Sequence, residues 1–413
     1  MNEQIANILD WDRTNLPFGV KGIGWGPKTS NGVETDEYAV LFFVDEKKEL
    51  KDLDPAEIIP SNFTIDDIEF RTDVQKTVQC KTFIGDCHVI SDTVEPVKTN
   101  RSRLRPLKPG TETMTLWGQY VATLGAFVTD KSDGQIVALS NSHVYAGSQL
   151  IASMFKVNDN GDFNTTNLSG YQPTGYWRTT PENDYIGVCK KGVPIGNISS
   201  SFPSIITSCD AAILKLKNYS LIDAVSSLNV LGFNQPGPYK FATEEEINSL
   251  VNPSSPNFRA PVFRSGRTCG PVGFPGYSSS CSLSTYAIQD VGVGTYSGEV
   301  STFINCFLVR GDVVAGRGGD SGSAYFALLS ANMPTLSTWK MIGLLFAGPD
   351  ESYPSFSVGC KITTVADDLN IASWNGNIPT ISADTQYITA NDSNSSIIEL
   401  SGRKFYQLGR GAV

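Results

Sequence analysis

Short apolar stretches separated by Gly, Asn, Asp and Ser follow one another from about residue 115 onward, and this pattern limits the fold more than any other feature. Many short strands with frequent turns are typical of β-barrels and β-sandwiches. The 38 glycines and 22 prolines also fit strands and turns better than helices. We therefore expect a mainly β fold. The stretches read LWGQYVATLGAFVTD, QIVALSNSHVYA, CDAAILKLK, APVFRSGRTCG, STYAIQDVGVGTYSGEV, FINCFLVRGDVVAG, SAYFALL and KMIGLLFAGP.

Length limits the number of domains, and net charge limits the classes of binding partner. A chain of 413 residues that is 40% hydrophobic can bury a sizeable core and form two or three domains. A net charge of −10 argues against binding to nucleic acid or to anionic membrane surfaces. The N-terminal stretch MNEQIANILDWDRTNLPFGV has no basic region followed by an apolar one, and no apolar run reaches the roughly 20 residues of a membrane helix. We expect a cytoplasmic protein, unless a signal has been removed.

The cysteines and histidines argue against a metal site, and we expect no metal or other cofactor. None of the eight cysteines forms a CxxC motif, and the chain has only two histidines. Four disulfides are possible, but buried free thiols fit a cytosolic chain of this size better. The cysteines are Cys80, Cys87, Cys189, Cys209, Cys269, Cys281, Cys306 and Cys360.

The chain divides by composition into four parts. Residues 1–95 read as a small α+β module: Glu37–Val44 and Phe63–Val74 are strand-like, and the charged stretch between them is helical or irregular. Within this module GIGWG predicts a tight turn rather than a phosphate loop. A basic, proline-containing linker covers 96–112, the β-rich domain covers 113–377, and a polar tail of unclear role covers 378–413.

Two helices are expected inside the β-rich domain, and two strands in the tail. Thr243–Val251 lies in an insertion at about 217–258, and its first residue can form a capping box with Glu246. Thr363–Ala372 predicts a helix that closes the β-rich region. TQYITA and SIIEL are possible strands of the tail.

Gly319-Asp320-Ser321-Gly322 combines the residues that a nucleophilic serine needs. Such a serine lies at a sharp turn, with backbone N–H groups converging where an oxyanion forms and a base within reach of its hydroxyl. Glycine allows the turn and lets the N–H groups of Gly319 and Ser321 face one point. A glycine-rich hairpin loop is the alternative. We expect Asp320 to hold the loop through an ion pair or hydrogen bonds.

Histidine is the expected base, and an aspartate is expected to orient it. His143 follows the apolar stretch VALSNS and precedes Ser321, so we favour it over His88. Asp210 opens the apolar run AAILKLK, where it can be partly buried; Asp184 is a second candidate. The resulting chain order of His, Asp, Ser differs from the Asp, His, Ser of subtilisins and the Ser, Asp, His of α/β-hydrolases.

These motifs resemble those of the chymotrypsin- and trypsin-like serine proteases. GDSGS resembles their nucleophile motif, LSNSHVYA their histidine motif and DAAILKL their acid motif. The closer likeness is to the intracellular trypsin-like peptidases of bacteria and plants, including the plant narrow-leaf proteins, which have stretches similar to EYAVLFFV, TLGAFVTD, SGRTCG and GLLFAG. The likeness covers most of residues 17–372 and leaves out the tail.

The resemblance implies a chymotrypsin-like double β-barrel with the active site between the barrels. His143 would act as general base and then general acid, Asp210 would orient it, and Ser321 would be the nucleophile. The N–H groups of Gly319 and Ser321 would form the oxyanion hole. The specificity pocket would map onto Ala315, Gly316, Leu345, Phe346, Ala347 and Gly348.

Three departures from the family pattern follow from the alignment of these motifs. Ala315 stands where a trypsin has aspartate, so cleavage after Lys or Arg is not supported. Asn141 and Ser142 replace the usual two alanines before His143, and no cysteine follows it. Arg317 beside the nucleophile loop either favours an acidic residue in the substrate or is a solvated surface charge.

We expect an intracellular serine endopeptidase that acts on a protein or peptide substrate. Two alternatives stay open: a regulatory peptide-binding protein on a protease scaffold, and a latent protease switched on by a protein partner or by cleavage of its own N-terminal module. The module itself could recruit substrates or inhibit the enzyme.

Overall fold

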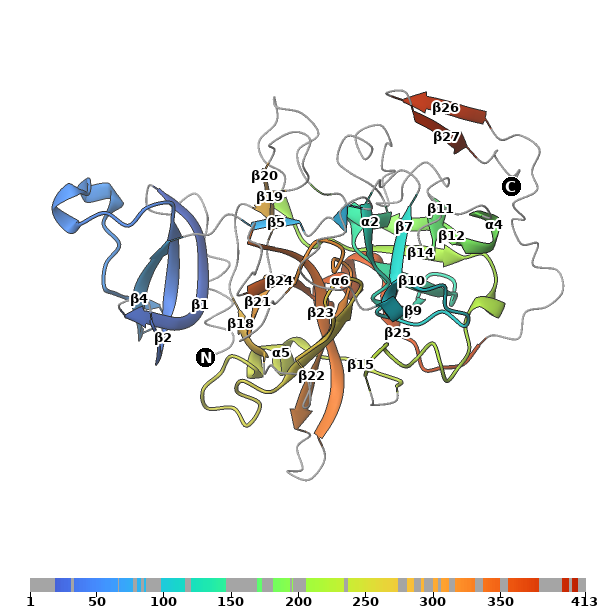
Figure 1. The fold of residues 1–413 in the computed structure, drawn as a ribbon. Helices are drawn as coiled ribbons and strands as arrows, with labels where there is room; N and C mark the ends of the chain where they lie inside the picture. The colour runs from blue at the N-terminus through green and yellow to red at the C-terminus, as the bar shows by residue number, and fades with distance from the viewer. Residues whose placement is uncertain are drawn as a thin grey trace.

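The structure is a computed structural model, and its fold is mainly β. It describes residues 19–30, 33–65, 67–76, 80–82, 85–86, 98–115, 120–145, 169–172, 181–193, 195, 206–233, 237–273, 281–285, 291–292, 300–303, 306–311, 316–330, 337–349, 356–378, 396–400 and 403–407. Figure 1 shows three groups of strands in a row: an N-terminal sheet in blue, a central group in yellow and orange, and a third group in cyan and green.

The N-terminal sheet has the order β1-β2-β4-β3 among the described residues. β1 and β2 form an antiparallel hairpin, and β2 pairs with β4 in parallel. Its small core consists of Ile23, Val40, Phe42 and Phe70. The strands are β1 Val20–Ser30, β2 Val33–Val44, β3 Asn62–Ile65 and β4 Ile68–Lys76.

Two local expectations for this region were wrong. GIGWG is not a tight turn, because it lies inside β1, where Gly26 lets the side chain of Leu41 pack within 3.0 Å of the position of a Cβ. The stretch 63–74 is not one strand but the hairpin of β3 and β4. Asp67 turns the chain there with a φ of 64°, a conformation that Asp tolerates better than most residues.

The charged stretch after β2 contains two 3-10 helices, η2 Leu50–Asp52 and η3 Pro55–Glu57. The N-terminal sheet ends at Lys76. Two short strands that follow it, β5 Cys80–Thr82 and β6 Gly85–Asp86, pair with strands of the two larger sheets instead. The segment expected to be a linker is also packed: Asn100 of η4 Lys98–Arg101 donates to the carbonyls of Gly110 and Gly266, each at 2.8 Å.

In the described part of the chain, nine strands form a sheet of order β25-β9-β10-β14-β12-β11-β7-β8-β6. Its core includes Leu107, Ala138, Ile186 and Leu214. The strands not yet given are β7 Glu112–Thr115, β8 Tyr120–Thr123, β9 Ala126–Asp130, β10 Ile136–Ser140, β11 Ser169–Tyr171, β12 Tyr185–Gly192, β14 Ala212–Leu216 and β25 Ile371–Ser373.

The second large sheet closes on itself. Of the strands that the structure describes, β23, β22, β16, β18, β21 and β24 pair in this order, and β24 pairs back with β23. All six pairings are antiparallel, so these strands form a barrel. The strands are β16 Val262–Gly266, β18 Cys281–Thr285, β21 Cys306–Gly311, β22 Ala324–Ser330, β23 Ser337–Pro349 and β24 Phe356–Lys361.

Further short strands pair with β16 and β23 outside the closed ring, or with one another. β5 joins β23 to β19, and β19 leads through β20 to β13. The strands are β13 Ile206–Thr207, β15 Lys240–Phe241, β17 Gly270–Val272, β19 Val291–Gly292 and β20 Val300–Phe303.

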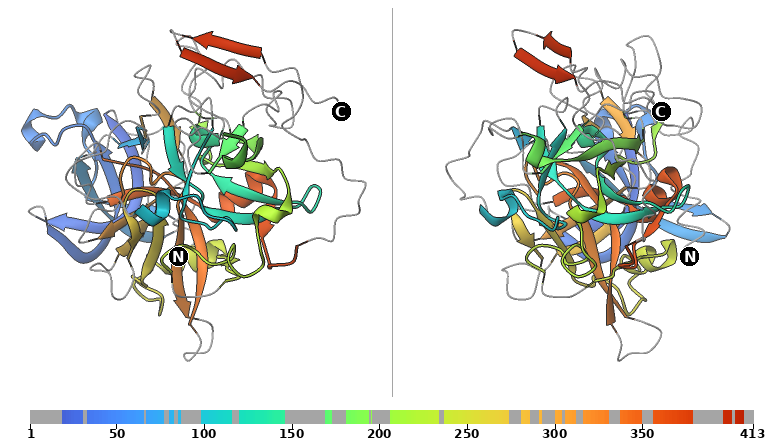
Figure 2. Two further views of the ribbon diagram at one scale, coloured as in Figure 1. Left: turned by 45° about the vertical axis from the view of Figure 1, so that its right-hand side comes forward. Right: turned by 90° about the vertical axis from the view of Figure 1, so that its right-hand side faces the viewer.

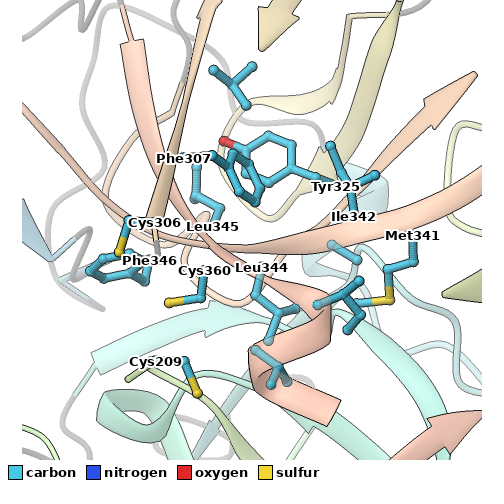
Figure 3. Close-up of a cluster of buried hydrophobic side chains, with 14 of the residues drawn as sticks. Cys209, Cys306, Phe307, Tyr325, Met341, Ile342, Leu344, Leu345, Phe346 and Cys360 are labelled. Carbon is cyan, nitrogen blue, oxygen red and sulfur yellow. The ribbon is translucent and has the colours of Figure 1, made fainter. Parts of the chain in front are cut away.

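The barrel core holds aromatic rings and thiols. Figure 3 shows Phe307, Tyr325 and Phe346 among aliphatic side chains, with Cys306 and Cys360 close to Phe346. The described cysteines Cys80, Cys189, Cys209, Cys306 and Cys360 are buried thiols outside any disulfide, and Cys269 is a half-buried thiol. The expectation of buried thiols is therefore confirmed for the first five.

Both expected helices are present, but the second ends earlier than expected, because Ile371 and Ala372 belong to β25. α5 Glu244–Ser249 has Thr243 as its N-cap with a complete capping box to Glu246, and α6 Ile362–Leu369 ends at Asn370 with a φ of 53°. The other helices described are α2 Ser142–Tyr145, α4 Pro181–Asp184 and the 3-10 helix η6 Tyr219–Leu221. In the tail, SIIEL is β26 Ser396–Leu400, which pairs with β27 Arg403–Gln407; TQYITA lies outside the described residues. Figure 2 shows this hairpin standing apart from the large sheets.

Candidate active site

Two strands of the nine-stranded sheet bring His143 and Asp210 together. The last residue of β10, Ser140, is in register with the first residue of β14, Ala212, so the residues beyond the two strand ends meet. His143 Nδ1 lies 2.5 Å from Asp210 Oδ2. Asp210 Oδ1 accepts the backbone N–H groups of Ser142 at 2.7 Å and His143 at 3.1 Å. The carboxylate therefore fixes both the ring and the backbone that carries it.

The residues before His143 strengthen this arrangement. Asn141 Nδ2 donates to the carbonyl of Asp210 at 2.6 Å, and Ser142 Oγ donates to the carbonyl of Val193 at 2.7 Å. Two alanines could make neither bond. Asn141 and Ser142 thus tie the histidine turn to β14 and to the end of β12 in a protein whose described cysteines make no disulfide.

Ser321 lies between the two large sheets. Its carbonyl accepts the N–H of Thr123 at 2.8 Å, and the N–H of Gly322 donates to the carbonyl of Leu345 at 2.8 Å. Its hydroxyl donates to the carbonyl of Phe346 at 3.3 Å. The first of these partners belongs to β8 and the other two to β23, so both sheets hold the serine.

Two glycines, Gly125 and Gly322, let the backbones of the two large sheets come into contact beside Ser321. A Cβ on Gly322, whose φ is 86°, would lie 2.0 Å from Ser140 Oγ, and one on Gly125 would lie 2.2 Å from the carbonyl oxygen of Gly322. Ser140 is three residues before His143, so this contact also brings the histidine turn to the serine loop.

His143 and Ser321 are not hydrogen-bonded to each other. His143 Nε2 is buried and has no hydrogen-bond partner in the described part of the chain. Ser321 is fully buried and His143 is 4% exposed. The structure thus contains the histidine–aspartate pair and places the serine at the same junction, with its hydroxyl directed to Phe346.

Asp320 holds the serine loop, as its position next to Ser321 suggested. Oδ1 accepts the N–H groups of Thr268 at 2.8 Å and Cys269 at 3.0 Å, and Oδ2 accepts the N–H of Arg317 at 3.0 Å. Arg264 Nη1 lies 3.5 Å from Oδ2, and both side chains are buried. Burial alone would lower the pKa of Arg264, but the Asp320 carboxylate raises it above its usual value, so Arg264 keeps its positive charge.

Gly319 has the conformation that only glycine adopts readily. Its φ is 94°, and a Cβ there would lie 2.7 Å from Thr268 Oγ1. Its carbonyl accepts the hydroxyl of Thr123 at 2.9 Å. Its N–H makes no hydrogen bond to any residue that the structure describes.

The residues assigned to a specificity pocket lie beside the serine. Gly316, Leu345, Phe346, Ala347 and Gly348 are buried, and Ala315 lies outside the described residues. The ring of Phe346 packs against that of Phe303, with centroids 4.6 Å apart. The described wall of this region is therefore apolar.

Asp184, the alternative to Asp210, pairs with an arginine instead of with His143. Asp184 is buried, and its Oδ1 lies 3.5 Å from Arg103 Nε. His88 lies outside the described residues.

The sequence did not identify a second buried ion pair, which links the two large sheets. Arg267 Nε donates to Glu112 Oε2 at 2.6 Å, and the N–H of Arg267 donates to Thr123 Oγ1 at 2.9 Å. A charged residue next to an apolar stretch signals that a partner is needed. The two residues are 155 positions apart in the sequence, so the sequence alone does not identify Glu112 as the partner of Arg267.

No helix in the described residues is long and apolar enough to cross a membrane. The same residues contain no group of three or more His, Cys, Asp or Glu side chains that could hold a metal ion.

Comparisons with known proteins gave no family model and no curated protein that matches. Among solved structures, the chain is similar to a glutamic acid specific serine protease that uses a histidine triad in substrate binding (13% identity, TM-score 0.38, 65% of this chain and 100% of the other). It is also similar to a Nocardiopsis protease (14%, 0.33, 65% and 98%) and to Cellulomonas bogoriensis chymotrypsin (12%, 0.35, 65% and 98%). Because these values are low, we base the function on the side chains of this chain.

Proposed function

We propose that the protein is a serine endopeptidase with Ser321 as nucleophile, His143 as base and Asp210 as the residue that orients His143. The observation that supports this most is the buried His143–Asp210 hydrogen bond of 2.5 Å at the junction that also holds Ser321. A carboxylate on Nδ1 leaves the proton there and the lone pair on Nε2, which is the form a base needs.

In the proposed reaction, Ser321 Oγ attacks the peptide carbonyl carbon while His143 Nε2 takes the hydroxyl proton. The N–H groups of Gly319 and Ser321 stabilise the oxyanion. The same proton then passes to the leaving amine, and an acyl-enzyme forms. Water attacks the ester, His143 takes one of its protons, and the return of that proton to Oγ frees the acid product.

The described state lacks the hydrogen bond from Ser321 to His143 that this reaction needs. Ser321 Oγ donates to Phe346, while His143 Nε2 has no partner among the described residues. The reaction requires the hydroxyl to leave Phe346 and to donate to His143 Nε2 instead. This observation favours a second candidate, a latent protease or an inactive protease-fold protein that binds peptides and regulates a protein partner.

The apolar surroundings of Phe346 support an apolar or aromatic residue on the acyl side of the cleaved bond, and Ala315 supports no preference for Lys or Arg. The free thiols support the cytoplasmic, narrow-leaf-type assignment, because reducing compartments keep thiols free.

A fluorophosphonate probe tests the proposal, since it reacts with a serine activated by a base. We expect labelling of the wild type on Ser321 and none of Ser321→Ala. Ser330→Ala, at the other end of β22, is the matched control and retains the label. An unlabelled wild type that binds peptides would favour the second candidate.

A further inference from the structure

A strand from the N-terminal third of the chain lies on the part of β23 that leads away from Ser321. β5 pairs with β23 in antiparallel register, with Thr82 opposite Ala347, Lys81 opposite Gly348 and Cys80 opposite Pro349. Figure 1 shows β5 beside β19 and away from the four-stranded sheet that precedes it in the chain.

The paired part of β23 begins next to the proposed nucleophile. Phe346, whose carbonyl accepts the hydroxyl of Ser321 at 3.3 Å, directly precedes Ala347. Extended peptides commonly bind by adding a strand to such an edge, with main-chain hydrogen bonds supplying the affinity. A peptide bound here lies along the nucleophile's own strand.

The direction of β5 is the one a substrate needs. Because the pairing is antiparallel, the chain runs from Cys80, which is farthest from Phe346, to Thr82, which is nearest. A peptide in the same register therefore points its C-terminal end at Ser321. The residue after the one that faces Ala347 then faces Phe346, and its carbonyl is the one presented for attack.

We infer that Cys80–Thr82 occupies the edge of β23 from Ala347 to Pro349 as a tethered peptide, and that it thereby excludes an extended substrate from the proposed active site. The evidence for this inference is the pairing of β5 with β23. That the occupied edge belongs to an active site rests on the proposed function. The ligand class is an extended peptide whose backbone replaces β5.

The reactivity of the Cys80 thiol reports whether β5 is paired with β23, and this readout does not depend on catalysis. Cys80 is 1% exposed, and burial together with the neighbouring Cys306 raises the pKa of its thiol to about 12, so it reacts slowly while β5 is in place. Cys360 is also buried, but lies in the closed barrel. If β5 can leave the edge, Cys80 becomes reactive before Cys360 does.

The first experiment uses the full chain with Ser321→Ala and iodoacetamide, read by mass spectrometry. The probe peptide has the sequence of residues 78–85, VQCKTFIG, with serine in place of its cysteine and an acetylated N-terminus. We expect an excess of this peptide to speed alkylation of Cys80 several-fold and to leave Cys360 unchanged. Equal rates at both cysteines, with or without peptide, would mean that β5 is a permanent strand of the core and would overturn the inference.

The second experiment compares Lys81→Pro with Lys81→Ala in the otherwise unchanged chain. Proline removes a backbone donor and disrupts strand pairing, whereas alanine keeps the backbone. We expect fluorophosphonate labelling to accelerate about 5- to 30-fold in Lys81→Pro, the effect of one or two lost backbone interactions, and to change less than about twofold in Lys81→Ala.

The outcomes separate this inference from the proposed function. Absence of labelling in every variant, with Cys80 still released by the peptide, would reject the nucleophile and keep the peptide-binding edge. Labelling of the wild type at the rate of Lys81→Pro, with Cys80 protected throughout, would reject the tethered peptide and keep the nucleophile.

Discussion

His143 Nδ1 lies 2.5 Å from Asp210 Oδ2, while the other oxygen of the same carboxylate accepts the backbone N–H of His143 at 3.1 Å. One side chain thus sets both the direction of the imidazole and the conformation of the turn that carries it. A substitution that keeps the shape of this side chain but removes its charge should therefore change the tautomer of the ring more than it changes the fold.

Asp210→Asn is expected to lower the rate of hydrolysis about ten-thousand-fold. The amide keeps one oxygen for the backbone N–H groups and turns its NH2 group toward Nδ1. The imidazole then carries its proton on Nε2 and cannot accept the serine proton. Asp184→Asn, a second buried aspartate, serves as the control and should retain activity. Steady-state kinetics with a peptide substrate measures both, and equal losses would count against Asp210.

Arg264→Met should destabilise the protein by about 3–5 kcal/mol, because it leaves the Asp320 carboxylate buried without its cation. Adding Asp320→Asn removes that charge, so the double variant should be more stable than the sum of the single changes predicts. Denaturant unfolding of the three variants gives the coupling. Simple additivity would show that the pair contributes no net interaction.

Gly319→Ala should lower kcat/KM about 100- to 1000-fold, as expected for loss of one oxyanion donor. Its φ of 94° and the 2.7 Å approach of Thr268 Oγ1 force the loop to shift. Gly134→Ala is the matched control: its φ is 71°, but nothing lies within 4 Å of the added methyl group. That variant shares the backbone strain of about 1–2 kcal/mol and should keep its kcat/KM.

The contribution of Asp130 to the stability of the nine-stranded sheet should be present near neutral pH and lost in acid. Burial alone would raise the pKa of Asp130, but hydrogen bonds from Lys190 and Ser132 lower it below its usual value. A lowered pKa stabilises the fold above the unfolded value of about 3.9, and this stabilisation is lost as the pH falls through the folded value.

Asp130→Asn should therefore cost about 1–3 kcal/mol near pH 7, with the gap to the wild type closing below about pH 4. Asp133→Asn removes the more exposed partner of the same lysine and should cost less than about 1 kcal/mol. Unfolding curves over the pH range measure both. A gap of constant size would mean that the charge of Asp130 does not matter.

Local signals allowed much of the fold to be predicted. The capping box at Thr243 and Glu246 specified α5, and apolar runs specified the strands around His143 and Ser321. The glycines at 22, 24 and 26 suggested a turn, yet they lie in β1, because tertiary packing against Leu41 outweighs glycine's preference for turns.

Contacts between residues far apart in the sequence could not be predicted from the sequence. The partnership of Glu112 with Arg267, of Asp320 with Arg264, and of β5 with β23 depends on how the sheets meet. No periodicity or turn signal within a few residues contains that information.

The glycine contacts at Gly125 and Gly322 leave no room for a spacer between the two sheets at the serine. Separating the two sheets at this point would break the backbone hydrogen bond from Thr123 to Ser321. In the two proposals above, activation moves the Ser321 hydroxyl away from Phe346 and removes β5 from β23, and neither step requires this contact between the sheets to open.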